Sequence, residues 1–288
     1  MRNFPPERII CLTEETVETL YLLGEQDRIF GVTGYAVRPP AVRKEKERVA
    51  AFTSAKIDKI LSLKPDLVLA FSDLQAEIAA DLIKNGVAVM AYNQRDIAGI
   101  LSMIRHLGAT VGVGEKAESL ASSYEKRLAD LRNLERHYVR PRVYFEEWDS
   151  PMITGIKWVS ELVEIAGGTD VFSALSSNEA ATDRIVTSSD VIEAAPDIII
   201  ASWCGKKLRP ESFREREGWA AIPAVQNNYI YEVKSPLILQ PGPAALIEAA
   251  PRALNTSPRG AIASEGSPTR RHVGPQQQES INGHVHPI

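Results

Sequence analysis

The chain has 288 residues and a mass of 31.7 kDa, which corresponds to about two domains at roughly 150 residues each. Its 33 Lys and Arg residues against 37 Asp and Glu residues give a formal net charge of -4, which excludes the basic surface of a nucleic-acid-binding protein. Hydrophobic residues make up 44% of the chain, enough for two ordinary cores, yet no run of 18 apolar residues would cross a membrane.

The first 114 residues alternate short β-rich runs with amphipathic helical patterns. Strands are predicted at residues 9–11, 29–33, 67–70 and 87–92, and helices at residues 14–23, 57–63, 74–85 and 97–107. Strands that alternate with helices are typical of a parallel sheet covered by helices on both faces. We therefore predict an N-terminal α/β lobe over residues 1–114.

Residues 115–138 form the longest helical pattern, with apolar residues three and four positions apart and no internal Gly or Pro. About 22 residues at a rise of 1.5 Å give roughly 33 Å, the span of a small domain. One interpretation is a large surface helix. The other, which its place between two α/β halves favours, is a rigid helix that connects two lobes.

The alternation resumes in residues 139–251, which we predict to form a second α/β lobe. Strands are expected at residues 142–147, 198–202 and 229–233, and a helix at residues 157–166. Both halves contain a short helix that ends at Pro-Asp before an apolar strand, and proline makes Lys64 and Ala195 natural helix ends. Two similar lobes joined by a helix place the expected ligand cleft between them.

Residues 252–288 are rich in Gly, Pro, Ser, Gln and Arg and lack apolar periodicity. Such a segment cannot bury enough apolar surface to offset the entropy of ordering, so a disordered tail is expected.

Neither a metal site nor a catalytic constellation is evident in the sequence. His106 and His137 fall on predicted helices among charged residues, and the other histidines lie in the tail, where His284 and His286 would bind a metal only weakly. The glycines of residues 108–114 lie between two helices, the wrong context for a dinucleotide loop. Cys11 and Cys204 sit in apolar runs and are expected to be buried free thiols. We expect no catalytic residue and no cofactor of the protein's own.

Aromatic residues gather at the ends of the predicted strands, where open α/β sheets form their ligand crevice. These residues are Tyr35, Phe52, Phe71, Trp148, Trp158 and Trp203. Core packing is an equal alternative for Phe52, Phe71 and Trp158. Trp148 and Trp203 are expected to face the cleft because polar neighbours disfavour their full burial, whereas Trp219 precedes an apolar run and is expected in the core.

Several motifs occur in a recognisable order along residues 8–250. They are TEET at 13–16, LLGxxDRIxGVT at 22–33, Tyr35 with Pro39-Pro40, IxxLKPDLV at 60–68, Thr154-Gly155, ELxxxAGG at 161–168 and WxxIPAV at 219–225. This set resembles the helical-backbone periplasmic binding proteins that serve ABC importers of cobalamin, haem and ferric siderophores. The cobalamin-binding branch is the most similar.

The resemblance implies two Rossmann-like lobes, a rigid connecting helix and a chelate held in the interlobe cleft. It implies ligand contacts from Tyr35, Phe52 and Phe71 in the first lobe and from Trp148 and Thr154 at the lip of the second. A flat corrinoid or porphyrin offers large faces on which such aromatic rings stack. It also implies one permease-docking acid per lobe. Asp58 occupies that place in the first lobe, whereas Ser189 occupies it in the second and Asp190 follows one residue later.

The leading hypothesis is a monomeric, non-enzymatic binding protein that delivers a metal chelate to an ABC permease. A corrinoid is the first candidate ligand, and haem or a ferric siderophore are the others. The alternative is a cytoplasmic protein or enzyme that handles tetrapyrroles or corrinoids on the same two-lobed fold. The resemblance implies a periplasmic or cell-surface location, whereas the absence of an apolar signal segment before residue 9 implies the cytoplasm if the given start is genuine.

Overall fold

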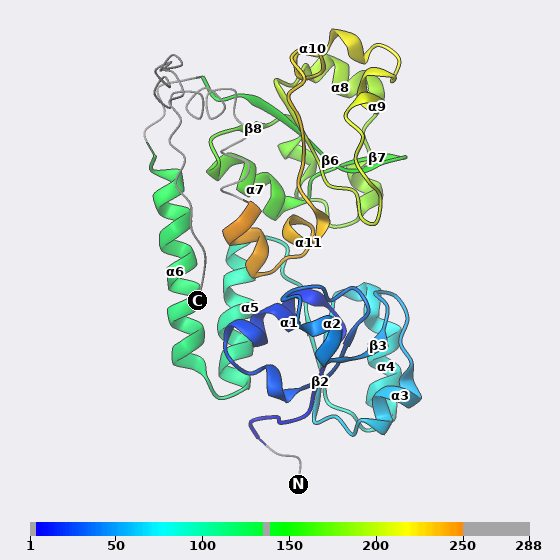
Figure 1. Cartoon of the computed structure of the whole chain (residues 1–288), viewed down its shortest axis with the longest axis vertical. Helices are drawn as coiled ribbons and strands as arrows, with labels where there is room; N and C mark the ends of the chain where they lie inside the picture. The colour runs from blue at the N-terminus through cyan, green and yellow to red at the C-terminus, as the bar shows by residue number, and fades with distance from the viewer. Residues whose placement is uncertain (1–3, 135–138, 250–288) are drawn as a thin grey trace, which may run out of the picture.

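The computed structural model describes residues 4–134 and 139–249. They form two α/β lobes with a long helix along one side (Figure 1). This confirms the predicted two-lobed α/β architecture. The predicted tail, residues 252–288, and the end of the predicted connector, residues 135–138, lie outside the described residues.

The first lobe is built on a five-stranded parallel sheet with the order β3-β2-β1-β4-β5. Its strands are β1 (Ile9–Cys11), β2 (Ile29–Thr33), β3 (Glu47–Ala50), β4 (Leu67–Phe71) and β5 (Val89–Tyr92). Its helices are α1 (Glu14–Leu22), α2 (Val42–Glu45), α3 (Ile57–Ser62), α4 (Ala76–Lys84) and α5 (Ile97–Thr110). Helices α1 and α5 cover one face of the sheet, and α3 and α4 cover the other. The strand order reverses between β1 and β4. In open α/β sheets, ligands bind next to the carboxyl ends of the strands at such a switch point.

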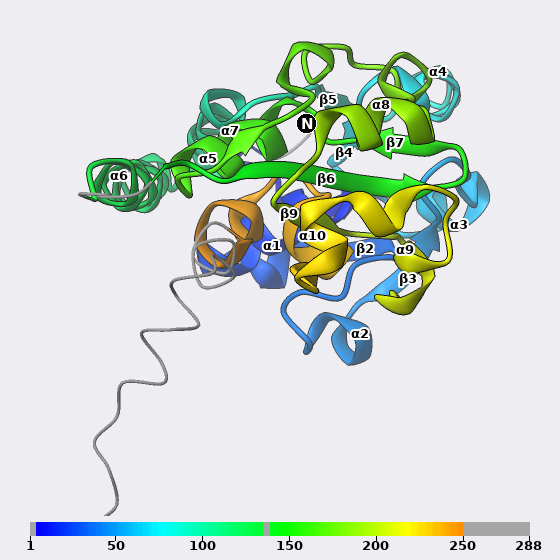
Figure 2. The same cartoon turned by 90° about the horizontal axis from the view of Figure 1, so that it is seen from above.

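The second lobe has a sheet with the order β10-β9-β6-β7, and β8 pairs with β6 as well. Its strands are β6 (Arg142–Asp149), β7 (Met152–Thr154), β8 (Thr169–Asp170), β9 (Ile198–Ala201) and β10 (Ile230–Glu232). Its helices are α7 (Lys157–Ile165), α8 (Ser188–Ala194), α9 (Glu211–Arg214), α10 (Pro223–Gln226) and α11 (Ser235–Ile238). Strand β7 is antiparallel to β6, whereas β8, β9 and β10 complete a parallel arrangement. Viewed from above, β6 starts beside α6 and crosses the whole lobe (Figure 2).

The Pro-Asp segments of the two lobes form the same set of hydrogen bonds. In the first lobe, Asp66 Oδ2 accepts the backbone N–H of Arg8 at 3.0 Å, and the Arg8 side chain donates to the Leu63 carbonyl at the end of α3. In the second, Asp197 Oδ2 accepts the N–H of Arg142 at 2.8 Å, and the Arg142 side chain donates to the Ala194 carbonyl at the end of α8. Each Arg–Asp pair thus fixes the start of the first strand of its lobe against a helix end.

The residues before both prolines adopt the left-handed conformation. Lys64 has a φ of 51° and Ala195 a φ of 40°. A helix cannot continue through a left-handed residue, so α3 ends at Ser62 and α8 at Ala194. The predicted helix ends are therefore confirmed, and the two lobes share this local geometry as well as their connectivity.

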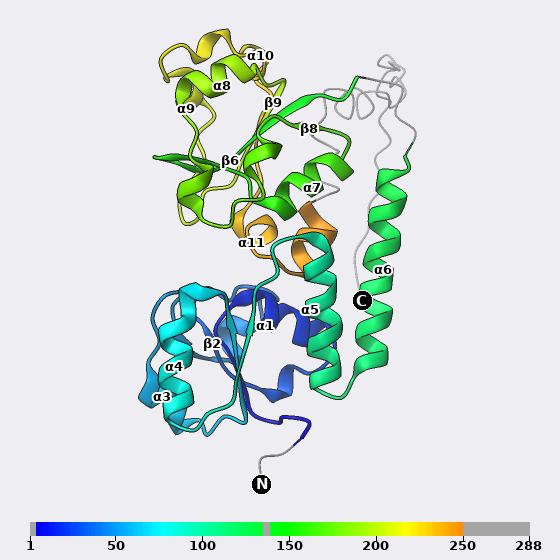
Figure 3. The same ribbon diagram turned by 180° about the vertical axis from the view of Figure 1, so that it is seen from behind.

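Helix α6 (Gly114–Arg132) is the predicted connector, although it ends before the predicted residue 138. Its buried residues Ala117, Ala121, Tyr124 and Leu128 pack along α5 and reach α7 and the segment after α11. A Cβ atom on Gly108 of α5 would lie 2.1 Å from the Cβ of Ala117, so Gly108 permits the close approach of the two helices. Helix α6 therefore lies against both lobes (Figures 1 and 3).

Residues 240–248, which we call the strap, leave the second lobe and pack on α1 of the first (Figure 2). Gln240 Nε2 donates to Glu14 Oε1 at 2.8 Å, and the N–H of Ala244 donates to Glu18 Oε2 at 3.1 Å. Arg38 of the first lobe pairs with Glu18 at 2.9 Å and also with Glu248 of the strap. The end of the predicted second lobe, 139–251, is thus attached to the first lobe.

Gly242 offers a test of the strap's contact with α1. A Cβ atom at this position would lie 2.6 Å from the Cβ and 3.1 Å from the Cα of Glu15, and the Cα cannot move without shifting the helix. We expect Gly242→Ala to lower the free energy of unfolding by about 1–3 kcal/mol, the usual cost of overpacking, in urea titrations. Gly34→Ala, whose Cβ would make an ordinary contact of 3.5 Å, is the control. Equal stability of the two variants would mean that the strap does not press on α1.

Candidate functional site

The candidate site is the seam between the lobes, where the loop after β5 of the first lobe contacts α7 and the strap of the second. The loop after β5 supplies Asp96, which pairs with Lys157 at the start of α7 at 2.9 Å. The N–H of Ile97 donates to Glu161 Oε2 of α7 at 2.8 Å, and Gln94 Nε2 donates to the Pro241 carbonyl at 2.9 Å. These contacts join the carboxyl end of β5 in the first lobe to α7 and the strap of the second.

The first lobe places its three aromatic candidates at different depths. Tyr35, two residues after β2, is 51% exposed, and Phe52, two residues after β3, is half-buried. Phe71, the last residue of β4, is only 5% exposed. The guanidinium of Arg95 covers it, with its carbon 5.0 Å from the centre of the ring. The rings of Tyr35 and Phe52 are therefore accessible, whereas the ring of Phe71 is covered by Arg95.

The second lobe keeps one of its three candidates accessible. Trp148 of β6 is half-buried, its Nε1 donates to the Ser150 carbonyl at 3.0 Å, and the Lys206 ammonium lies 6.0 Å from the centre of its ring. Thr154 is fully buried, because its hydroxyl donates to the Phe145 carbonyl across the β6–β7 hairpin. The expected place of Thr154 on the lip is corrected to a position beneath it.

Trp203 also lies beneath the surface, at 6% exposure, and not at the cleft as the sequence predicted. Its ring stacks on Phe213 with centres 5.8 Å apart, and its Nε1 donates to Glu146 Oε1 at 3.2 Å. The polar neighbours on which the prediction relied do not oppose burial. Lys206 instead lies over the Trp203 ring at 5.0 Å and pairs with Asp149. Trp158 and Trp219 are both buried in the core. This confirms the core position predicted for Trp219 and favours core packing as the alternative that holds for Trp158.

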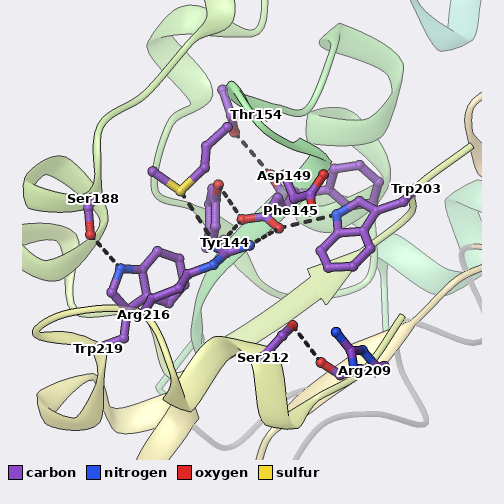
Figure 4. Close-up of polar contacts among 12 residues, drawn as sticks. Tyr144, Phe145, Asp149, Thr154, Ser188, Trp203, Arg209, Ser212, Arg216 and Trp219 are labelled. Carbon is purple, nitrogen blue, oxygen red and sulfur yellow. Dashed lines mark hydrogen bonds and ion pairs between the residues drawn. The ribbon is translucent and has the colours of Figure 1, made fainter. Parts of the chain in front are cut away.

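A buried ionic network, which no sequence pattern indicated, holds Trp203 (Figure 4). The fully buried Glu146 accepts both terminal nitrogens of Arg216, at 2.6 and 2.9 Å, and the hydroxyl of Tyr144 at 3.1 Å. The Arg216 guanidinium lies over both the Phe213 and Trp219 rings, 4.4 Å from each centre. Burial raises the pKa of Glu146, while Arg216 favours its ionised form. The partners are 70 residues apart, beyond the reach of any sequence pattern.

The two predicted docking acids have different surroundings. Asp58 is exposed in the first turn of α3. Asp190 is exposed as well, but its carboxylate forms a capping box at the start of α8 and accepts the N–H and the hydroxyl of Thr187, each at 2.7 Å. These hydrogen bonds lower the pKa of Asp190. Asp190 thus has a local role in its helix in addition to any role at the surface.

Three glutamates of α1 lie under the strap, and Glu15 is the most deeply buried of them. The hydroxyl of Thr13 donates to Glu15 Oε1 at 2.6 Å, and the strap's Gly242 lies against its side chain. The pKa of Glu15 is raised to about 7, mainly by burial and to a smaller extent by the neighbouring charge of Glu14. Burial also raises the pKa values of Glu14 and Glu18.

Glu15 should therefore make stability depend on pH. Because its pKa is about 7 in the folded protein and near 4.5 in the unfolded chain, folded molecules hold its proton where unfolded ones release it. Its contribution to stability is complete below pH 4.5 and is lost as the pH rises to about 7. We expect the free energy of unfolding of Glu15→Gln, taken relative to that of wild type, to rise by about 3 kcal/mol between pH 4.5 and about 7. Urea titrations at several pH values measure the difference, with the exposed Glu115→Gln as control. Parallel profiles for wild type and Glu15→Gln would contradict the assignment.

Among residues 4–134 and 139–249, no group of three or more His, Cys, Asp or Glu side chains is arranged to hold a metal ion. Within the same residues, no helix is long and apolar enough to cross a membrane. Cys11 is buried as predicted, and burial raises the pKa of its thiol to about 12. Cys204 is exposed, contrary to the prediction, because it lies in the loop after β9.

The geometry defines a two-lobed α/β protein whose lobes are linked by a long helix that packs on both of them. A family model described as periplasmic binding protein matches residues 9–237, and the chain belongs to this family. The family consists of substrate-binding proteins. This confirms the resemblance that the sequence motifs indicated.

Individual relatives agree with this membership. The vitamin B12-binding protein of Vibrio cholerae is 29% identical over 251 residues, which cover 85% of this chain and 87% of that protein. The ABC transporter substrate-binding lipoprotein YvrC of Bacillus subtilis is 26% identical over 255 residues, covering 83% of this chain and 76% of that protein. The crystal structure of the periplasmic vitamin B12-binding protein BtuF of Vibrio cholerae superposes with a TM-score of 0.71 at 26% identity. It covers 91% of this chain and all of that one.

Proposed function

We propose that this protein captures a metal chelate, with a corrinoid as the first candidate, between its lobes and delivers it to an ABC importer. The observation that carries the proposal is that each lobe keeps an aromatic residue accessible just after or at the end of a strand, Tyr35 after β2 and Trp148 near the end of β6, and we propose that both face the space between the lobes. Relatives named for vitamin B12 binding and for ABC transport support it. Tyr35, Phe52 and Trp148 would contact the chelate directly, while Phe71, Thr154 and Trp203 would support the residues around it.

A planar macrocycle suits this seam for a physical reason. Its broad faces are apolar and its rim is polar, so aromatic side chains can stack on the faces while polar side chains bind the rim. Trp148 lies beside Asp149 and Lys206, which gives the second lobe such a mixture of ring surface and charge. Haem shares the planar form with a corrinoid, and a ferric siderophore is the remaining candidate.

The chain would act outside the cytoplasmic membrane, in the periplasm or at the cell surface, as the family description and the lipoprotein relative suggest. We propose that a single chain is the working unit, because both lobes and the strap that joins them come from one polypeptide.

Replacement of Trp148 tests the proposed binding site. An aromatic contact contributes about 0.5–1.5 kcal/mol beyond the buried area, and 1.4 kcal/mol changes affinity about tenfold. We expect Trp148→Ala to weaken binding at least about tenfold in fluorescence titrations with cyanocobalamin, haemin and a ferric siderophore. Phe4→Ala removes an exposed aromatic ring from the N-terminal segment, which lies at the end of the first lobe away from the second (Figure 1), and should leave affinity unchanged. Wild-type protein that binds none of the three ligands would disprove the chelate assignment.

The proposed contact with the permease can be separated from helix capping. Asp58→Ala should leave ligand affinity and thermal stability at the wild-type level, yet weaken the stimulation of a reconstituted importer's ATPase activity by the loaded protein. Asp190→Ala should instead lower the midpoint of thermal unfolding, because it removes the capping box of α8. Thr187→Ala, which removes the same cap at a cost of about 1 kcal/mol, is the matched control. Normal ATPase stimulation by Asp58→Ala would exclude Asp58 from docking.

A further inference from the structure

Arg95 has an unusual position at the seam. It follows β5 in the loop that contacts the second lobe, and its guanidinium carbon lies 5.0 Å from the centre of the Phe71 ring. Its side chain is 18% exposed. A ligand that approached Phe71 from the seam would therefore meet the guanidinium before it met the ring.

The carboxylates near Arg95 are at ion-pair distance but too far for hydrogen bonds. Asp73 Oδ1 lies 3.9 Å from Arg95 Nη2, and Glu179 Oε2 of the second lobe lies 4.0 Å from Arg95 Nε. Nε donates instead to the neutral Asn93 Oδ1 at 3.0 Å. Both acids are highly exposed, with 86% and 62% of their side chains accessible, so water screens their attraction for the arginine.

Three cations of the second lobe are bound more closely. Lys157 pairs with Asp96 at 2.9 Å, Arg184 pairs with Glu147 at 2.6 Å, and Lys206 pairs with Asp149. Each of these cations has a carboxylate at hydrogen-bond distance, whereas Arg95 has only the two longer contacts among the residues that the structure describes. Of these four cations, Arg95 is thus the best able to exchange its present carboxylates for an anionic group of a ligand.

We infer that Arg95 binds an anionic substituent of the chelate and so selects for ligands that carry one. The inference rests on the proposed function and adds the chemical class of the ligand's rim. The anion would be the phosphodiester of a corrinoid nucleotide loop or a carboxylate of a porphyrin. The planar guanidinium offers parallel N–H donors that match either group in a bidentate arrangement. Asp73 and Glu179, being exposed, can turn aside to admit the anion.

Matched ligand pairs test the inference. Cyanocobalamin carries the phosphodiester and dicyanocobinamide lacks it, while haemin carries free carboxylates and its dimethyl ester lacks them. We expect Arg95→Ala to weaken binding of the anionic ligand of each pair by about tenfold or more, as for loss of a charged hydrogen bond. Its affinity for the ligand that lacks the anionic group should not change. Salt should weaken wild-type binding of the anionic member and have less effect on Arg95→Ala. Arg95→Lys should fall between the two because it keeps the charge and loses the bidentate geometry.

Arg105→Ala is the matched control. Arg105 is an arginine of α5 that pairs with Glu118 at 2.8 Å and Glu125 at 3.0 Å on the outer surface, and its loss should not change affinity for any of the four ligands. Equal losses for both members of a pair, or no loss at all in Arg95→Ala and Arg95→Lys, would overturn the role of Arg95 and leave the proposed function intact. A wild-type protein that binds none of the four ligands would overturn both.

Discussion

This structure depends on one continuous apolar core to which both lobes contribute residues. Buried residues of β1 and α1 in the first lobe join those of α5 and α6, and these join α7 and the strap of the second lobe. Any rotation of one lobe against the other would expose this shared surface to water, at about 25 cal/mol per Å² of apolar area. The residues at the seam are consequently held by a common core, so the ligand site proposed there would be largely formed in advance.

Charge is distributed around this core in two contrasting ways. In the second lobe, Glu146 and Arg216 form a buried pair in which tyrosine, tryptophan and arginine donors satisfy the carboxylate. In the first lobe, Glu15 is buried beside two further glutamates and has only neutral donors close to it. Burial raises the pKa of both carboxyl groups, but Arg216 opposes the shift at Glu146, whereas the charge of Glu14 adds to the shift at Glu15. The two buried acids therefore differ in whether a cation is bound to them.

The sequence predicted the features that local chemistry determines. Alternating strands and helices, the Pro-Asp helix ends and the core position of Trp219 all follow from patterns within a few residues. The depth of side chains at the seam could not be predicted in this way. Trp203 is buried because Phe213 and Glu146, which are distant in sequence, complete its surroundings, and Phe71 is covered by an arginine from a different strand end. Contacts between elements decide these positions, and a single sequence does not encode them in its spacing.

The strap also limits how the lobes of two related proteins can be recombined. A new binding protein could be assembled by joining the first lobe of one relative to the second lobe of another within α6. Here such a recombinant would cover the α1 glutamates with a foreign strap, and Arg38 would lose its native partner in that segment. The inherited unit is therefore not the lobe. Residues 240–248 must descend together with α1, so recombination that respects the fold requires two crossovers, one in the connector and one before the strap.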